Sequence, residues 1–243
     1  MNVAIVPARS GSKRLPNKNI KLLNGLPLVC WTINAFLRSD CFDRVIFSSD
    51  SNHYFDVVSD NISDPRLSFH SRTNVEAGDK VKIFDYLRES YTSFCSKDDC
   101  LAMGLPTAPL RTSDQIREAF QLSIKSGRSV FSASEYDFSV PFAFTLQAGA
   151  NEENQTWTPL FGNESPMITG NTRSQDQLKY LHPNGAIYVI QRAAMLNSIN
   201  TFYHGSIPYV MDALSSIDVD TLTDFSIAEA VCADQYGKYK SNS

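Results

Sequence analysis

The chain has 243 residues, of which 42% are hydrophobic and 20% are charged, and its formal net charge at pH 7 is −4. A chain of this length and composition can bury one substantial core, so we expect a single ordered domain over residues 1–243. The acidic balance argues against nucleic acid as the main partner, because binding to a phosphate backbone requires a broad basic surface.

The five cysteines are scattered along the chain without a C-x-x-C pair. An odd number of unclustered thiols is typical of a reducing compartment. No run of about 18 apolar residues occurs, and the first apolar strand follows Met1 without a charged leader. We therefore expect no membrane span, no signal peptide and a cytoplasmic location.

The first predicted element is a buried apolar strand that starts at Val3, and a basic loop follows it. Between Arg9 and Asn19 the loop has four cations and no carboxylate, and its small residues let backbone amides approach an anion closely. The cations are Arg9, Lys13, Arg14 and Lys18. The spacing matches neither the Walker motif nor the dinucleotide-binding motif. We interpret the loop as a site for polyphosphate, and a solvated basic loop is the alternative.

The same loop carries a resemblance to a known family. Residues 8–19 have the pattern A-R-x-G-S-K-x-L-P-x-K-N, which resembles the signature of the CMP-sialic acid synthetases (acylneuraminate cytidylyltransferases) and their legionaminic and pseudaminic acid relatives. A shorter version with R-L-P is also similar to the CMP-KDO synthetases. The resemblance implies a Rossmann-like α/β fold of the nucleotide-diphospho-sugar transferase type, with a mostly parallel sheet flanked by helices.

The resemblance also implies roles for the residues of the loop. Arg9, Lys13 and Lys18 would bind the triphosphate of CTP and take part in catalysis. Gly11, Ser12 and Asn19 would be further nucleotide contacts.

The next predicted elements alternate between helix and strand. Apolar residues at helical spacing predict a helix from Pro27 to about Arg38, and an apolar run from Arg44 to Ser49 predicts a buried parallel strand. Asp50 follows this strand, where a similar S-T-D sequence stands in the resembling family. We expect Asp50 either to face the site at the end of the strand or to cap the following helix.

A further strand is predicted over residues 67–72, and a helix over about 82–91. The resembling family has a comparable arginine after this strand and a comparable aspartate before this helix. The resemblance therefore implies that Arg72 contacts the nucleotide and that Asp79 orders the nucleotide loop. An ordinary surface charge is the alternative for Arg72, and we expect His70 to be structural.

Residues 100–104 predict a central strand, and residues 105–111 predict the turn at its end, which two prolines make rigid. The capping-box spacing of Thr112 and the glutamine three residues later predicts the start of the next helix, and Gly127 predicts its end. Another strand is predicted over 129–134.

The turn after the central strand resembles the family motif Q-P-T-S-P-L-R. The resemblance implies that Pro106 and Thr107 contact the nucleotide. Leu105 stands where many members have glutamine, so an apolar side chain replaces one that can hydrogen-bond. This departure leaves open whether a nucleotide contact or a sugar contact changes.

Residues 135–183 break the regular alternation and are rich in aromatic residues, Asn, Gly and Pro. So much apolar area outside the layered pattern requires a partner surface. In the resembling family the equivalent insertion is a dimerisation arm that reaches over the other subunit's site. The resemblance thus implies a homodimer in which Arg173 and Gln175, from an element similar to R-x-Q-D, bind the sugar. A lid that folds back on its own domain is the alternative.

Residues 184–190 return to a strand pattern and match the family motif N-G-A-I-Y almost letter for letter. The resemblance implies that Asn184 and Gly185 bind the sugar, and it favours a nonulosonic acid over KDO. A short helix over about 193–198 and a strand over 207–211 are predicted to follow.

Two carboxylates, Asp218 and Asp220, lie at period two, so both project from one face of an extended segment. Such a pair suits Mg²⁺, which takes oxygen ligands from one or two carboxylates and from substrate phosphates. The I-D-x-D-T-x-x-D-F pattern matches the family's metal motif, and the resemblance adds Asp218 to the catalytic residues. Asp220 as the cap of a helix over about 223–235 is the alternative.

Together these motifs predict a cytidylyltransferase that activates a nonulosonic, sialic-type acid with CTP and Mg²⁺ to give a CMP-sugar and pyrophosphate. A CMP-KDO synthetase-type enzyme and a non-catalytic nucleotide-binding protein are the alternatives.

Overall fold

The computed structural model describes the chain apart from residues 74, 79–80, 96–99, 148–154, 193–201 and 237–243. The chain divides into two compact units. The first unit contains Met1–Ala133 and Pro183–Ser243, and the second unit contains Ser134–His182. The insertion expected over residues 135–183 and the second unit differ by one residue at each end. The role of this segment in dimerisation stays a prediction.

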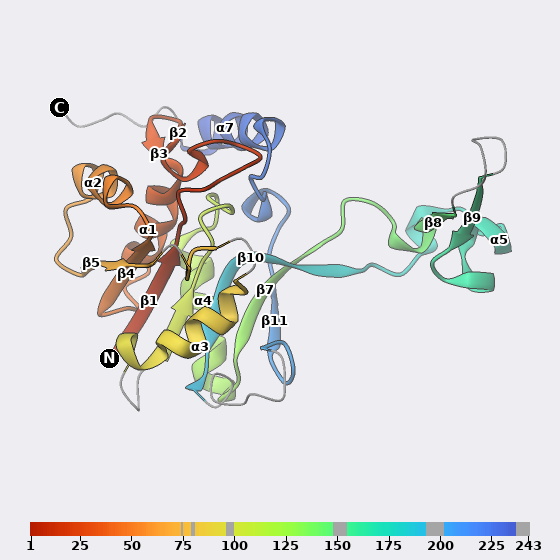
Figure 1. Cartoon of the computed structure of the whole chain (residues 1–243). Helices are drawn as coiled ribbons and strands as arrows, with labels where there is room; N and C mark the ends of the chain where they lie inside the picture. The colour runs from red at the N-terminus through yellow and green to blue at the C-terminus, as the bar shows by residue number, and fades with distance from the viewer. Residues whose placement is uncertain (74, 79–80, 96–99, 148–154, 193–201, 237–243) are drawn as a thin grey trace. The chain divides into compact units, whose positions relative to one another are not determined.

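A seven-stranded sheet forms the centre of the fold (Figure 1). Its strands are β1 (Asn2–Pro7), β4 (Arg44–Ser49), β5 (Leu67–Ser71), β6 (Cys100–Met103), β7 (Val130–Glu135), β10 (Leu181–Ile190) and β11 (Ile207–Val210), in the spatial order β11-β7-β10-β6-β1-β4-β5. β1 pairs in parallel with β4 and β6, β4 with β5, and β7 with β11, whereas β10 is antiparallel to β6. The predicted mostly parallel α/β sheet is confirmed.

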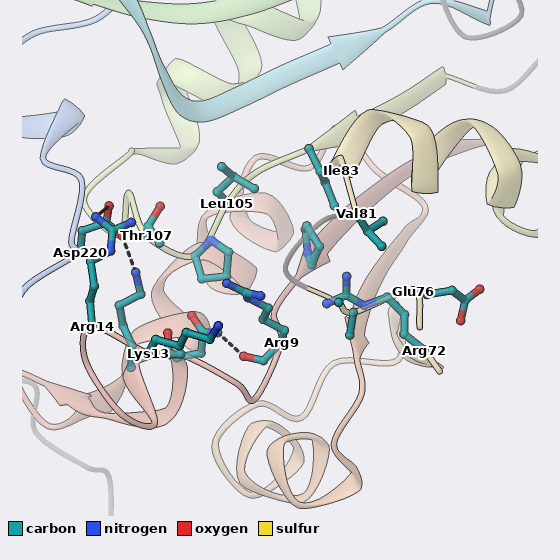
Figure 2. A pocket seen from close by; sticks show the side chains of 17 residues that line it. Arg9, Lys13, Arg14, Arg72, Glu76, Val81, Ile83, Leu105, Thr107 and Asp220 are labelled. Atoms are coloured by element: carbon teal, nitrogen blue, oxygen red, sulfur yellow. Dashed lines mark hydrogen bonds and ion pairs between the residues drawn. The ribbon is translucent and has the colours of Figure 1, made fainter. Parts of the chain in front are cut away.

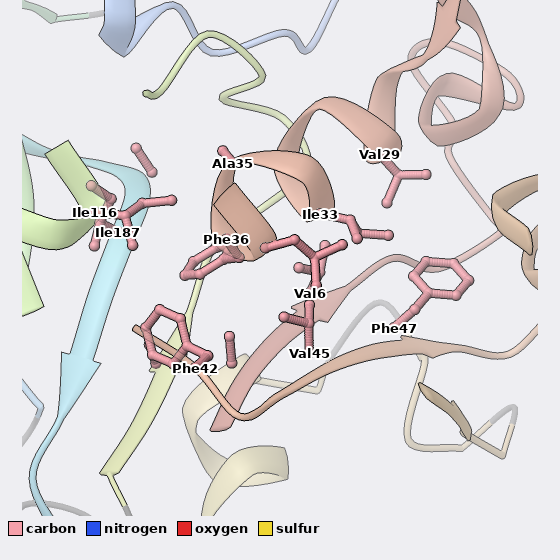
Figure 3. Packing of buried hydrophobic residues seen from close by; sticks show 14 of the residues in the cluster. Val6, Val29, Ile33, Ala35, Phe36, Phe42, Val45, Phe47, Ile116 and Ile187 are labelled. Carbon is pink, nitrogen blue, oxygen red and sulfur yellow. The ribbon is translucent and has the colours of Figure 1, made fainter. Parts of the chain in front are cut away.

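Helices cover both faces of this sheet, and β1 shows how the sequence specifies the two layers. Ala4 and Val6 pack into a core cluster with residues of α1 (Leu28–Arg38), α2 (Asn52–Asn61) and α4 (Ser113–Ser126) (Figure 3). Val3 and Ile5 point to the opposite face and pack with α3 (Ile83–Phe94). Alternate side chains of a strand face opposite sides of a sheet, so a central strand must be apolar at every position.

A third core cluster supports the end of the chain. Residues of α7 (Leu222–Tyr236) pack against Leu23 of β2 (Leu22–Leu23), and Leu110 and Val219 lie in the same cluster. β2 pairs antiparallel with β3 (Leu26–Pro27), which leads directly into α1. The loop after β6 and the segment with Val219 are therefore held together by apolar packing.

The helix-end predictions are largely confirmed. α1 ends at Arg38, as expected. Thr112 and Gln115 form a capping box at the start of α4, and Gly127 ends that helix with a left-handed φ of 66°. α3 runs to Phe94, three residues beyond the predicted end. The helix predicted over about 193–198 lies outside the described residues.

The second unit contains the hairpin of β8 (Phe144–Gln147) and β9 (Thr156–Pro159), the short helix α5 (Pro166–Thr169) and three-residue 3₁₀ turns. Many large apolar side chains in it are exposed, among them Phe138, Leu146, Trp157, Leu160, Ile168 and Leu178. Across the described part of the chain, no helix has the length and hydrophobicity needed to span a membrane.

Candidate functional site

A cavity of about 620 Å³ lies where several strands of the sheet end (Figure 2). Pro7 at the end of β1, Arg72 after β5 and Leu105 after β6 contribute to its wall. The carboxyl edge of a parallel sheet is where such folds bind ligands. The predicted site residues that line this cavity are Arg9, Ser12, Lys13, Lys18, Asn19, Arg72, Pro106, Thr107 and Asp220.

The basic loop is held in place by Asp50. Its carboxylate accepts hydrogen bonds from the backbone amide of Ser10 at 2.8 Å and from the Ser10 hydroxyl at 2.9 Å. The side-chain amide of Asn19 donates to the carbonyl of Arg9 at 2.9 Å and ties the two ends of the loop together. Ser51, not Asp50, caps α2 by accepting a bond from the amide of Tyr54. The interpretation of Asp50 as a helix cap is therefore wrong.

Lys18 joins the loop to the carboxylate segment near the end of the chain. Its buried ammonium donates to Asp220 Oδ1 at 2.8 Å and to the carbonyl of Val219 at 2.7 Å. Arg14, whose side chain is exposed, contacts Asp220 Oδ2 at 2.8 Å. Both carboxylate oxygens of Asp220 thus face cations that come from the loop.

The alternative prediction for Asp220, that it caps a helix, is wrong. Thr221 and Asp224 cap α7 instead, since the Asp224 carboxylate accepts from the amide of Thr221 at 2.7 Å and the Thr221 hydroxyl accepts from the amide of Asp224 at 3.3 Å. The Asp224 carboxylate also accepts from the backbone amide of Asp220 at 3.1 Å. The side chain of Asp220 therefore does not cap the helix, and it contacts Lys18 and Arg14 at the cavity.

Asp218 lies beside the turn that follows β6. The Thr107 side chain hydrogen-bonds to its carboxylate, and the amide of Val219 donates to the Thr107 carbonyl at 2.7 Å. Loss of surrounding water raises the pKa of the Asp218 carboxyl, even though the residue is exposed at the surface. Burial lowers the pKa of the neighbouring Arg111 guanidinium to about 9, and the charge of Asp218 opposes this shift.

The two carboxylates are compatible with a magnesium site. Asp218 and Asp220 supply hard oxygen donors two residues apart on one irregular segment. Mg²⁺ commonly uses only one or two carboxylates besides phosphate oxygens and water. Within the described residues no group of three or more His, Cys, Asp or Glu side chains is arranged to hold a metal on its own. A metal at this position would need further oxygen ligands from water or a substrate.

Arg72 is a buried residue with 7% of its surface exposed, so the interpretation as a surface charge is wrong. Its amide donates to the carbonyl of Ser49 at 2.8 Å, and burial lowers the pKa of its guanidinium. Asp79, predicted to order the same region, lies outside the described residues. Val81 and Ile83, which the sequence analysis did not select, form an apolar part of the cavity wall beside Arg72 (Figure 2).

Both the oxygen and the nitrogen of the Asn184 side-chain amide have partners within the protein. Its Oδ1 accepts from the Ser132 hydroxyl at 2.5 Å and from the Ala186 amide at 3.1 Å. Its Nδ2 donates to the Ser216 hydroxyl at 2.9 Å and contacts Met211 Sδ at 3.6 Å. The structure thus gives Asn184 a structural role, and its predicted contact with a sugar stays a prediction.

Gly185 and Leu105 are packed directly against each other. The amide of Leu105 donates to the carbonyl of Gly185 at 3.1 Å, and Gly185 has a φ of 73°. A Cβ atom at Gly185 would lie 2.9 Å from Leu105 Cδ1, so any larger residue would displace this side chain. Gly185 therefore fixes the position of Leu105 in the cavity wall.

Four described residues of the first unit that were predicted for the site do not line the cavity: Gly11, Asn184, Gly185 and Asp218. Arg173 and Gln175 are exposed residues of the second unit, where Arg173 Nε lies 3.6 Å from Asp176 Oδ2. Their predicted contact with the sugar stays a prediction. Gly11 is exposed on the basic loop but does not line the cavity, and a Cβ atom there would meet nothing within 4 Å.

Comparison with known proteins gives a consistent result. A family model described as cytidylyltransferase matches residues 3–80. The chain is 31% identical over 237 residues to the pseudaminic acid cytidylyltransferase of Campylobacter jejuni, with 94% of each protein covered. It is 29% identical over 235 residues to the CMP-N,N'-diacetyllegionaminic acid synthase of Legionella pneumophila, covering 93% of this chain and 94% of that protein.

Two further relatives extend the comparison. The chain is 30% identical over 231 residues to the N-acylneuraminate cytidylyltransferase of Escherichia coli, and the match covers 93% of this chain but about half, 51%, of that relative. A solved structure of CMP-2-keto-3-deoxy-manno-octonic acid synthetase complexed with CTP matches with a TM-score of 0.65 and 16% identity, covering 96% of this chain and 99% of that one. This likeness concerns the fold alone. The near full-length match to the Campylobacter protein shows that the chain belongs to the acylneuraminate cytidylyltransferase (CMP-sialic acid synthetase) family, which includes the pseudaminic and legionaminic acid enzymes.

Proposed function

We propose that the protein transfers CMP from CTP to a nonulosonic acid and releases pyrophosphate. The observation that carries this proposal is the contact between Lys18 of the basic loop and Asp220 of the carboxylate segment, on the wall of one cavity. Nucleotidyl transfer requires cations that bind phosphate oxygens and carboxylates that hold a metal. The lining of this cavity, with the loop cations and Asp220, supports such a role. The names of the relatives point to the same reaction.

In the proposed reaction, the anomeric hydroxyl oxygen of the sugar forms a bond to the α-phosphorus of CTP. The bond from this phosphorus to the bridging oxygen breaks, and pyrophosphate leaves. Arg9 and Lys13, which line the cavity, neutralise the charge of the triphosphate. The hydroxyl proton passes to a base, for which the Asp218 carboxylate beside Thr107 is the proposed candidate.

Asp218 and Asp220 are the proposed ligands of Mg²⁺, which would reduce the negative charge of the phosphate oxygens when bound. The chain's own cations have a separate task. Lys18 is buried and bonded twice to the carboxylate segment, so it orients Asp220 as well as adding positive charge to the cavity.

The sugar is proposed to be an N-acylated 2-keto acid of the sialic, legionaminic or pseudaminic type. Leu105, Val81 and Ile83 give the cavity an apolar wall, which suits a sugar with acyl groups and few hydroxyls. An apolar wall rejects a hydroxylated analogue only weakly, whereas a site built to bond an N-acyl group rejects a sugar without one strongly. We therefore expect graded discrimination within the family and sharp discrimination against KDO.

The second unit is proposed to be a dimerisation arm, and the protein a cytoplasmic homodimer. The exposed apolar side chains of the unit, including Trp157 and Leu160, would be covered by a second copy. Arg173 and Gln175 would then bind the sugar carboxylate in the partner's site. Light scattering should report a dimer at micromolar concentration. Mixing Asp218→Ala with Arg173→Ala subunits should restore part of the activity, and a monomer, or no recovery on subunit exchange, would contradict this arrangement.

The reaction is tested by measuring pyrophosphate release with each of the four nucleoside triphosphates, combined with N-acetylneuraminic, diacetyllegionaminic, pseudaminic and KDO acids. We expect release with CTP and a nonulosonic acid, and its loss in excess chelator. Highest kcat/KM with KDO would support the CMP-KDO synthetase alternative. Binding of CTP without pyrophosphate release in the presence of any of these acids would support the non-catalytic alternative.

A further inference from the structure

Tyr86 lies in the first turn of α3, in the core beneath the Arg72 end of the cavity. Only 2% of its surface is exposed. Its hydroxyl lies 2.9 Å from the Ser48 hydroxyl and 3.1 Å from His70 Nδ1. Burial raises the pKa of Tyr86, so the hydroxyl keeps its proton at neutral pH and the network stays uncharged at this residue. Contacts from two adjacent strands thus fix the position of the hydroxyl end of the Tyr86 ring.

The ring of Tyr86 carries the guanidinium of Arg72 on its face. The central carbon of the guanidinium lies 5.2 Å from the ring centroid, within the range of a cation–π contact. The Nε donor of Arg72 has no hydrogen-bond partner among the described residues. An arginine this deeply buried without a bonded carboxylate requires another source of stabilisation, because losing water disfavours its charge.

Arg72 also faces a like charge. Arg9 extends into the same cavity, and its charge opposes that of Arg72 (Figure 2). A flexible arginine in this setting would turn away from Arg9 unless the protein held it. The Tyr86 ring contacts the guanidinium, and the Arg72 amide is bonded to the Ser49 carbonyl. The charges of Asp50 and Glu76 also favour the charged guanidinium.

We propose that Tyr86 is a positioning residue for nucleotide binding, which holds the Arg72 guanidinium toward the nucleotide through its aromatic face. This inference rests on the proposed function, since it takes CTP as the ligand of the cavity. His70 and Ser48 act one step further back, by fixing the hydroxyl end of the ring. The face of the ring, rather than the hydroxyl, supplies the interaction with Arg72.

The test is a double-mutant cycle read out as the dissociation constant of CTP by calorimetry. Tyr86→Leu should weaken CTP binding by about 3- to 30-fold, the range of a desolvated cation–π contact. The same substitution in an Arg72→Ala background should have no further effect, because Tyr86 acts through Arg72. Tyr86→Phe should bind CTP within about threefold of the parent, a change of about 0.6 kcal/mol.

Two controls separate positioning from general damage. Leu87→Ala removes a fully buried side chain of the same helix and core cluster, and it should leave CTP affinity unchanged in the folded protein. Trifluorophenylalanine in place of Tyr86 keeps a phenyl ring but withdraws electron density from its face, so it should weaken CTP binding relative to Tyr86→Phe. This comparison remains informative if Tyr86→Leu does not fold.

Each outcome bears on a different part of the proposal. Equal losses from Tyr86→Leu with and without Arg72 would show that Tyr86 acts by supporting the core, and the inference would be overturned. No difference between the phenyl and fluorinated rings would exclude the aromatic face as the cause. Unchanged CTP binding in Arg72→Ala would show that Arg72 does not contact the nucleotide, and the positioning role of Tyr86 would be refuted with it. Absence of CTP binding in the parent protein would instead refute the proposed function.

Discussion

Replacing Asn184 with alanine tests whether this residue serves the fold or the substrate. In the structure, the substitution leaves the Ser132 hydroxyl and the Ala186 amide without their acceptor, in a region where Asn184 is only 6% exposed. An unsatisfied buried donor costs about 1–3 kcal/mol. Because the Ser132 hydroxyl can rotate toward another acceptor, we expect a total in the lower half of the range for two donors, about 3 kcal/mol of unfolding free energy.

The expected loss converts into a measurable change in melting temperature. For a domain of this size, 1 kcal/mol corresponds to roughly 2–4 °C, so Asn184→Ala should melt roughly 6–12 °C lower than the parent. Urea unfolding should show the same loss as a lower midpoint with an unchanged slope. Asn61→Ala is the matched control, since its exposed side chain donates only to the Val57 carbonyl, and it should change stability by less than about 0.5 kcal/mol.

The kinetic readout decides between the two roles. If the amide is structural, folded Asn184→Ala at low temperature should keep a KM for the sugar within about twofold of the parent, which corresponds to about 0.4 kcal/mol. An unchanged melting temperature together with a sugar KM raised tenfold or more, about 1.4 kcal/mol, would refute the reasoning from the hydrogen bonds. It would restore Asn184 as a sugar ligand.

Three further substitutions test other parts of the site. Asp218→Ala should lower kcat by about 10²-fold or more, the scale of losing one preorganised electrostatic group, and an unchanged kcat in a folded variant would remove Asp218 from catalysis. Gly185→Ala should destabilise the protein by about 1–3 kcal/mol in urea unfolding, because its φ of 73° is strained for alanine and the new Cβ would press on Leu105. Stability equal to the parent would show that this contact relaxes freely. Asp50→Ala should raise the KM for CTP several-fold, since it frees both Ser10 donors that order the basic loop, and an unchanged KM would mean that the loop is ordered without Asp50.

The layered fold could be predicted from the sequence because its signals are local. Residues 3–6 are apolar at every position, which is what a strand buried on both faces requires, and the capping box of Thr112 and Gln115 lies within four residues. The role of the residues that follow β4 was harder to predict. Asp50 and Ser51 are both good helix caps, and only the direction of the backbone decides that Ser51 caps α2 while Asp50 holds the basic loop.

The site itself depends on contacts that sequence patterns do not encode. Lys18 and Asp220 are 202 residues apart, and their motifs predict a phosphate loop and a carboxylate pair without predicting that the two bond to each other. The same holds for Asn184, whose partners lie 52 and 32 residues away, and for the aromatic support of Arg72. Residue types at known positions predict chemistry, whereas the choice between ligand contact and internal contact is made by the tertiary structure.

The charges around the cavity give a physical reason for combining a basic loop with a carboxylate pair. Among the described residues that line it, Arg9, Lys13, Arg14, Lys18 and Arg72 are cationic, and Glu76 and Asp220 are anionic, which leaves a net charge of +3 in a chain whose formal charge is −4. Positive charge is thus concentrated at one place, which suits a small anion better than a nucleic acid. CTP carries about four negative charges at neutral pH and a 2-keto acid adds about one more, so the proposed substrates exceed the charge of the cavity by about two. Asp218 beside the cavity adds one further negative charge, so a divalent cation at Asp218 and Asp220 would supply most of the difference, where the loop cations already meet Asp220.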